Sequence, residues 1–141
     1  MIINCPLTQN SSISINDTIY CFLGMDDTWK SVSSCYKLEG NTWTSQPNMK
    51  HERTAAAASS TAKGGMFVTG GLDLTLTPLL STEVLNNGEW EEGPQMPVRL
   101  AQHCQVSSES GIIVAGELGI NLLSYIDNCM QERIGIIIRT L

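Results

Sequence analysis

The chain has 141 residues, with 8 Lys and Arg against 14 Asp and Glu, which gives a formal net charge of −6. This length allows one ordinary domain and is too short for two. The acidic balance argues against nucleic acid and against an anionic membrane surface as partners, because both require a basic footprint. No stretch of the sequence approaches the roughly 20 apolar residues that are needed to span a bilayer.

The N-terminus and the cysteines bear on the cellular setting. Met1 to Asn10 lacks the basic start and the apolar core of a signal peptide. The cysteines are odd in number and form no C-x-x-C pair, whereas a disulfide framework is usually even and denser. We therefore expect reduced thiols and a cytoplasmic location, with the nucleus as the alternative. The five cysteines are Cys5, Cys21, Cys35, Cys104 and Cys129.

The first third of the chain contains two features that return later. An apolar run, Cys21-Phe22-Leu23, ends at Gly24, and Trp43 opens the segment Trp-Thr-Ser-Gln-Pro-Asn-Met. Recurring features of this kind are the signature of a repeat fold. We take about residues 11–46 as the first copy.

The second copy, about residues 53–93, divides most clearly into short strands with turn signals between them. This spacing, without helical periodicity, favours an all-β repeat fold. Asn87-Gly88 is a strong two-residue hairpin signal. The expected strands are a run of small residues from Thr54 to Ser60, Met66 to Thr69 before Gly70-Gly71, Thr82 to Asn86, and a strand that begins at Glu89-Trp90.

The copies are separated by 46 or 47 residues. Trp43 and Trp90 both begin the pattern W-x-x-x-P-x-M at an offset of 47, whereas Arg53 and Arg99 are 46 apart. Aligning Gly24 with Gly70, and Gly70 with Gly116, also gives an offset of 46. We expect the one-residue difference to lie in the loop between Met and Arg, where a deletion is tolerated.

The third copy is partial, covering about residues 99–128. No tryptophan stands at the expected position near Glu132, and residues 129–141 form a divergent tail. Within the tail, Ile134 to Ile138 is a β-prone apolar run without a repeat match. Two interpretations remain open: a makeshift fourth strand, or sequence from a truncated or misjoined gene product.

These features together resemble the kelch repeat: an apolar strand ending in Gly-Gly, a strand containing Val, then a Trp followed by a Met and an Arg. The resemblance covers about residues 11–128. It implies an all-β fold, a kelch-type β-propeller fragment of four-stranded antiparallel blades in an incomplete ring. The open sheet edges of such a fragment lead us to expect self-association. The resemblance assigns architectural roles to Gly24, Trp43, Gly70, Gly71, Trp90 and Gly116.

No catalytic or metal-binding constellation is apparent in the sequence. His51 and His103 are the only histidines, and adjacent strand positions would place His103 and Cys104 on opposite faces. His51-Glu52 lacks the second His of H-E-x-x-H. We therefore expect neither enzymatic activity nor a cofactor.

The family resemblance implies that loops at one rim bind a protein ligand. These are the loops after Gly-Gly and those before the innermost strand of each blade. Arg53 and Arg99 could bind an acidic ligand, although a structural role is equally compatible with their positions. The candidate contact residues are Asp26, Asp27, Trp29, Lys30, Arg53, Asp73 and Arg99.

The function that follows is a protein-interaction module, expected to be the substrate-binding portion of a larger adaptor. Many kelch proteins carry a BTB domain and recruit targets to a cullin ubiquitin ligase, but these 141 residues contain no BTB segment. The alternatives are a propeller-based enzyme or carbohydrate-binding fragment, and a truncated gene product without function.

Overall fold

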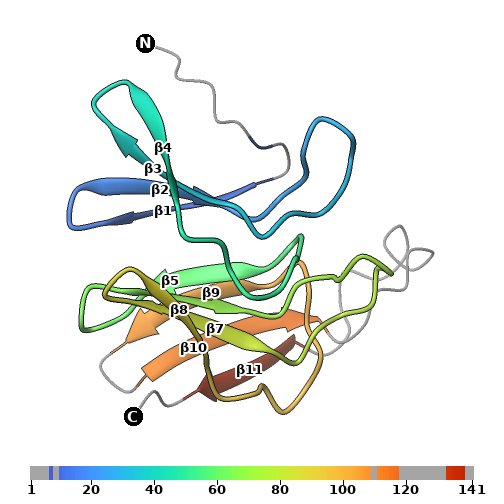
Figure 1. Ribbon diagram of the computed structural model, residues 1–141. Coiled ribbons are helices and arrows are strands. Elements are labelled where there is room, and N and C mark those ends of the chain that lie inside the picture. The colour runs from blue at the N-terminus through green and yellow to red at the C-terminus, as the bar shows by residue number, and fades with distance from the viewer. Residues whose placement is uncertain (1–6, 8–9, 109–110, 118–132, 139–141) are drawn as a thin grey trace.

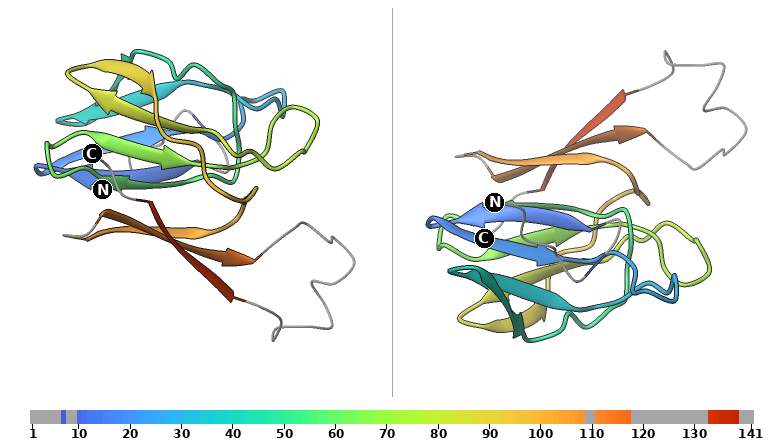
Figure 2. Two further views of the ribbon diagram at one scale, coloured as in Figure 1. Left: turned by 90° about the horizontal axis from the view of Figure 1, so that it is seen from below. Right: turned by 90° about the horizontal axis from the view of Figure 1, so that it is seen from above.

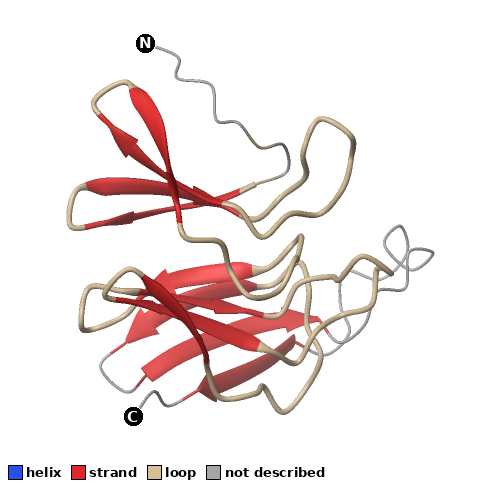
Figure 3. Cartoon of the chain, viewed as in Figure 1, coloured by secondary structure: helices blue, strands red, loops and turns tan. Residues whose placement is uncertain are grey.

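The computed structural model describes residue 7 and residues 10–108, 111–117 and 133–138. Within this part of the chain the secondary structure consists of strands only, joined by loops and turns (Figure 3). The strands form three antiparallel sheets, which confirms the all-β prediction. The sheets follow one another in chain order and pack side by side (Figure 1).

The first sheet has the order β1-β2-β3-β4, so each strand pairs with the next strand along the chain. Asn16 and Asp17 connect the first two strands with positive φ angles of 49° and 59°, as a tight hairpin requires. The strands are β1 (Ser11–Ile15), β2 (Thr18–Phe22), β3 (Cys35–Glu39) and β4 (Thr42–Gln46).

The second sheet repeats this arrangement in the order β5-β6-β7-β8. Asn87 and Gly88 have φ angles of 51° and 82° between the last two strands, so the predicted two-residue hairpin is confirmed. The strands are β5 (Ala57–Ser60), β6 (Met66–Thr69), β7 (Thr82–Asn86) and β8 (Glu89–Glu92).

The third sheet has three described strands in the order β11-β10-β9. They are β9 (Cys104–Ser108), β10 (Gly111–Glu117) and β11 (Arg133–Ile138). The isoleucine-rich run of the expected tail is therefore the third strand of this sheet, and Ile137 stands opposite Ile113 of β10. The remainder of the expected tail and the end of the third copy lie outside the described residues.

The backbone shows that the first two copies are related by 47 residues throughout the loop after the second strand. Leu23 and Gly24 have φ angles of 60° and 105°, and Gly70 and Gly71 have 57° and 93°. Gly24 therefore corresponds to Gly71, and the sequence alignment of Gly24 with Gly70 is wrong by one residue. Leu23 occupies the left-handed position that Gly70 fills in the second copy.

The alignment of Arg53 with Arg99 is corrected in the same way. The amides of Met49 and Met96 donate equivalent hydrogen bonds to the carbonyls of Ser33 and Leu80, again at 47 residues. Continuing this register places Arg53 opposite Leu100, and both residues are fully buried. The one-residue difference instead falls after β9, where four residues join Ser107 to Ile112 against five between Ser60 and Met66.

The first interface between sheets is apolar. Phe22, Cys35 and Met49 from the first copy pack against Met66, Val68 and Trp90 from the second. The Trp90 indole Nε1 donates a hydrogen bond of 2.9 Å to the Pro47 carbonyl, so the ring is fixed between the two sheets. Trp43, the equivalent residue of the first sheet, is half-buried, and its Nε1 has no hydrogen-bond partner among the described residues.

The second interface combines a smaller apolar cluster with a series of polar contacts. Gln105 on β9 donates from Nε2 to the Ser59 hydroxyl and to the Phe67 carbonyl, both at 2.8 Å. Gly116 is required by a close approach here, since a Cβ at this position would lie 2.5 Å from the Cβ of His103. The apolar members are Phe67, Met96, Leu100, Ile112 and Val114.

Among the described residues, the cysteines differ from the sequence expectation at Cys21. Cys21, which is almost completely buried on β2, is disulfide-bonded. Cys35 and Cys104 carry free thiols, and burial raises the pKa of Cys35 to about 12. The expectation of five reduced thiols is therefore wrong for Cys21, because an odd cysteine count does not exclude a single bridge.

Replacement of Trp90 by alanine should lower the free energy of unfolding by about 3–5 kcal/mol, the usual loss for a large buried ring. Urea unfolding measures this change. Trp29→Ala is the matched control, because Trp29 is exposed on a loop, and should change stability by no more than about 0.5 kcal/mol. Equal effects of the two substitutions would contradict a core role for Trp90.

Candidate functional site

Two long loops extend from the same end of the first and second sheets, next to each other in both views of Figure 2. We call residues 23–34, between β2 and β3, rim loop 1, and residues 70–81, between β6 and β7, rim loop 2. Of the exposed large hydrophobic side chains in the described part of the chain, three lie on these loops. They are Trp29, Leu74 and Leu76, which are 71%, 64% and 62% exposed.

Rim loop 1 is organised by the carboxylate of Asp26. Its Oδ1 accepts hydrogen bonds from the Thr28 amide at 2.8 Å, the Thr28 hydroxyl at 2.7 Å and the Lys30 amide at 3.1 Å. Two backbone bonds close the same turn, from the Trp29 amide to the Asp26 carbonyl and from the Asp26 amide to the Lys30 carbonyl. These interactions define the path of the backbone around Trp29.

Rim loop 2 contains the same arrangement 47 residues later. Asp73 Oδ1 accepts bonds from the Thr75 amide at 2.8 Å, the Thr75 hydroxyl at 2.6 Å and the Thr77 amide at 3.0 Å. The two backbone bonds recur between Asp73 and Leu76 and between Asp73 and Thr77. We call this five-bond arrangement the aspartate bracket.

The aspartate brackets favour ionised carboxylates. The pKa of Asp26 lies below its ordinary value, mainly because of the bond from the Thr28 hydroxyl and then that from the Lys30 amide. The pKa of Asp73 is lowered in the same way by Thr75 and Thr77, with a smaller contribution from the charge of Arg99. The charge that holds each bracket is therefore maintained well below neutral pH.

Each aspartate bracket holds a bulky residue in a left-handed conformation. Trp29 has a φ angle of 63° and Leu76 one of 60°. This region costs an L-residue about 1–2 kcal/mol, and bulky residues are uncommon there. Strain of this kind persists only where the surroundings impose it, and it is concentrated at functional sites. The two loops therefore present Trp29 and Leu76 to solvent at a cost to the backbone.

A groove lies beside rim loop 2, with a volume of about 550 Å³. Leu74 and Leu79 form its apolar side, and the connection between β4 and β5 supplies Lys50, His51 and Glu52. Ser33 of rim loop 1 also reaches it. The groove is thus lined by residues of both rim loops and combines apolar with charged side chains.

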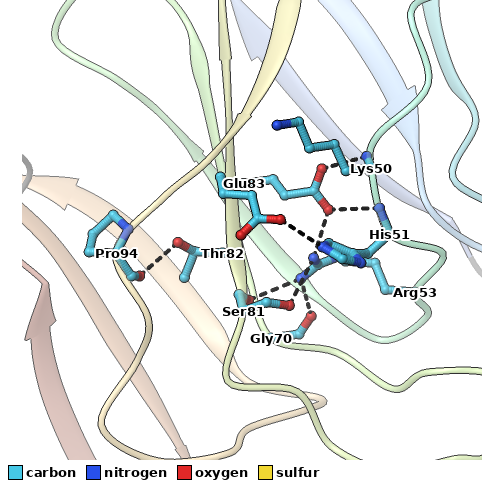
Figure 4. A network of polar contacts seen from close by, with 9 residues as sticks. Lys50, His51, Arg53, Gly70, Ser81, Thr82, Glu83 and Pro94 are labelled. Atoms are coloured by element: carbon cyan, nitrogen blue, oxygen red, sulfur yellow. Dashed lines mark hydrogen bonds and ion pairs between the residues drawn. The ribbon is translucent and has the colours of Figure 1, made fainter.

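A buried ion pair lies next to the backbone that lines the charged side of this groove. Arg53 Nη2 and Glu83 Oε1 are 2.7 Å apart, and both side chains are 0% exposed. The Glu83 carboxylate also accepts bonds from the amides of Lys50 and His51 at 2.7 and 3.1 Å. It therefore fixes the backbone that supplies the charged side of the groove (Figure 4).

Arg53 also holds both ends of rim loop 2. Its Nη1 donates to the Gly70 carbonyl at 2.8 Å and to the Ser81 carbonyl at 3.1 Å (Figure 4). Burial lowers the pKa of the guanidinium and the charge of Glu83 opposes this, so Arg53 stays protonated. As it is enclosed by these partners, direct contact with a ligand, one of the roles considered from the sequence, is excluded for Arg53.

The other candidate residues occupy different positions around the rim. Arg99 is exposed and its Nη1 donates to the Pro78 carbonyl of rim loop 2 at 2.9 Å. Asp27 and Lys30 are exposed on rim loop 1 beside Trp29. Asp26 and Asp73 are scaffold residues, because one carboxylate oxygen of each accepts three bonds within its own loop.

The sequence interpretation did not identify Leu74 and Leu76. A signal for them was present, since D-x-T occurs at Asp26 and again at Asp73, 47 residues later. The left-handed positions of Trp29 and Leu76 could not be inferred, because neither residue type favours that conformation.

The two histidines take part in separate polar networks. His51 Nε2 lies 3.3 Å from Glu92 Oε1 near the surface. His103 is buried, and its Nε2 lies 2.7 Å from the Thr69 hydroxyl, which in turn donates to Gln105 Oε1 at 2.5 Å. Because the single hydroxyl proton goes to Gln105, the His103 Nε2 must carry a proton and donate to Thr69. His103 Nδ1 is then a buried acceptor for which the described part of the chain supplies no donor.

Within the described residues no three His, Cys, Asp or Glu side chains are grouped so that they could hold a metal ion. No helix long and apolar enough to cross a membrane occurs there either.

Comparison with known proteins finds a curated sequence relative and similar solved structures. No family model matches the chain. It is 30% identical over 110 residues to the kelch repeat protein M-T8 of Myxoma virus (strain Lausanne), an alignment that covers 75% of the chain and 21% of the relative. The structure of YjhT aligns with a TM-score of 0.67 at 11% identity, over 79% of the chain and 39% of YjhT. The chain thus spans about a fifth of the length of the curated relative.

Replacement of Asp73 by alanine should release rim loop 2, because the Asp73 carboxylate accepts three of the five bonds of its aspartate bracket. Amide hydrogen exchange should become several-fold faster at Thr75 and Thr77. Asp27→Ala, which removes a neighbouring aspartate of rim loop 1 outside the bracket, should leave both loops unchanged. Unaltered exchange in Asp73→Ala would contradict the bracket.

The buried His103 should make stability depend on pH. Burial lowers its pKa from 6.5 to about 4, so folding favours the neutral ring, and the resulting stability is fully present above pH 6.5. It should be lost as the pH falls from about 6.5 to about 4, by about 3 kcal/mol.

Urea unfolding at pH 7 and pH 4 measures this loss in the wild type and in His103→Gln. The variant should lose about 3 kcal/mol less than the wild type over this range. His51→Gln, at an exposed histidine, should retain the wild-type dependence. Identical pH profiles for the wild type and His103→Gln would exclude His103 as the source.

Proposed function

The chain is a kelch-repeat propeller segment, and we propose that it holds a protein ligand at its rim through rim loops 1 and 2. The proposal makes it a binding module that does not transform its ligand. The main observation behind this proposal is that the two aspartate brackets hold Trp29 and Leu76 exposed to solvent in left-handed conformations. Leu74 and the adjoining groove extend the same surface.

The energetics of the two loops support this proposal. Exposing Trp and Leu at strained positions contributes nothing to folding, because the side chains bury little surface and the backbone loses stability. Burial of those side chains against a partner would recover the hydrophobic contribution. Trp is also enriched among the residues that dominate binding energy at protein interfaces. Asp27, Lys30 and Arg99 would supply the polar rim around this apolar centre.

A finer assignment rests on the kelch resemblance alone. We propose that the chain is the substrate-binding portion of a larger adaptor, in which a BTB domain elsewhere would recruit a cullin ubiquitin ligase. A cytoplasmic location belongs to the same proposal. The disulfide at Cys21 stands against that location, since disulfides are rare in reducing compartments.

Leu76→Gly separates binding from folding. Glycine adopts the left-handed conformation without strain, so the variant should be at least as stable as the wild type in urea unfolding. Its capture of protein ligands should nevertheless fall at least tenfold, and that of Trp29→Gly likewise. Quantitative affinity enrichment from extracts, followed by mass spectrometry, measures the ligands retained.

Ile19→Ala is the control for this experiment. Ile19 is an exposed hydrophobic residue on β2, outside the rim loops, and its replacement should leave capture unchanged. A set of ligands that is retained equally by all variants would refute binding at the rim.

A further inference from the structure

The third sheet ends at a strand that has a described neighbour on one side only. In the first two sheets the third strand is covered by a fourth, β4 or β8, whereas β11 pairs with β10 and stands at the edge of its sheet (Figure 1). An edge strand presents a row of backbone N–H and C=O groups that can pair with another chain. The position taken by β4 and β8 is therefore open beside β11 among the described residues.

The composition of β11 differs from that of the other two edges. β8 reads Glu-Trp-Glu-Glu and β4 reads Thr-Trp-Thr-Ser-Gln, so charged and polar residues protect both of these edges from pairing. β11 reads Arg-Ile-Gly-Ile-Ile-Ile and carries no charge after Arg133. β-branched residues favour strands, and this edge lacks the features that normally prevent association.

We propose that β11 pairs antiparallel with β11 of a second copy of this chain. The two three-stranded sheets would then form one continuous sheet of six strands across a two-fold axis. With the axis at Ile136, Ile136 of each copy stands opposite Ile136 of the other, and Ile134 stands opposite Ile138. The strand is thus complementary to itself, and Arg133 does not face its own counterpart.

The composition of the sheet edges favours this partner over the alternatives. Pairing of β8 with its counterpart would place glutamates near one another, which is unfavourable. Pairing of β11 with β8 of another copy is heterologous and would leave one edge of each kind unused, so the assembly would continue to grow. The β11 pair uses the same edge on both copies, and assembly therefore stops at the dimer.

Sedimentation velocity of the 141-residue chain over a hundredfold range of concentration tests this pairing. The expected result is a reversible monomer–dimer equilibrium without larger species. Amide exchange within residues 133–138 should slow at high concentration, because the outer row of backbone amides becomes hydrogen-bonded in the dimer. A monomer at every concentration, or growth beyond the dimer, would overturn the proposal.

Two lysine substitutions distinguish edge pairing from stacking of sheet faces. Ile137 and Val106 both stand opposite Ile113, but Ile137 is at the edge and Val106 is on the innermost strand of the same sheet. Ile137→Lys should weaken dimerisation at least tenfold, whereas Val106→Lys should leave it unchanged. The reverse pattern would show that the sheet face makes the contact. Wild-type circular dichroism in both variants is the folding control.

Discussion

The ion pair between Arg53 and Glu83 is the interaction on which the rim of this molecule depends. Two charges have been taken out of water, and loss of either one would leave the other unpaired at a cost of about 3–5 kcal/mol. The pair is sustained by its additional bonds. Arg53 joins the two ends of rim loop 2, and Glu83 binds the backbone that leads from the first sheet into the second. This one buried ion pair thus fixes the position of rim loop 2 relative to the backbone of Lys50 and His51, which line the groove.

Much of the fold could be predicted from the sequence, because several strands are marked by strong local signals. Met66–Thr69 and Thr82–Asn86 have the predicted bounds, and the hairpin at Asn87-Gly88 follows from residues that accept positive φ. The predicted alignment of Gly24 with Gly70 is wrong by one residue for a physical reason. Glycine was taken as the marker of the left-handed position, yet in the first copy Leu23 occupies that position and Gly24 the next one.

The structure assigns local structural roles to several residues that the sequence offered as candidate ligand contacts. Asp26 and Asp73 were chosen as candidate ligand contacts in the rim loops, and the carboxylate of each accepts hydrogen bonds that shape its own loop. For Arg53 the sequence allowed either ligand binding or a structural role, and the burial of its side chain supports the structural role. Burial of a charged side chain depends on a partner distant in sequence, here Glu83, 30 residues away. Only the fold brings such groups together, so no local pattern could reveal them.

The two interfaces between sheets differ in chemistry, and this difference has a consequence for how the molecule comes apart. The first is an apolar contact that includes Phe22, Met66 and Trp90, and hydrophobic association weakens on cooling. The second is tied by the directed bonds of His103, Thr69 and Gln105, which acid would disrupt by charging a ring that has no acceptor for the additional proton. Cooling would therefore weaken the interface between the first and second sheets. Acid would weaken the interface between the second and third sheets.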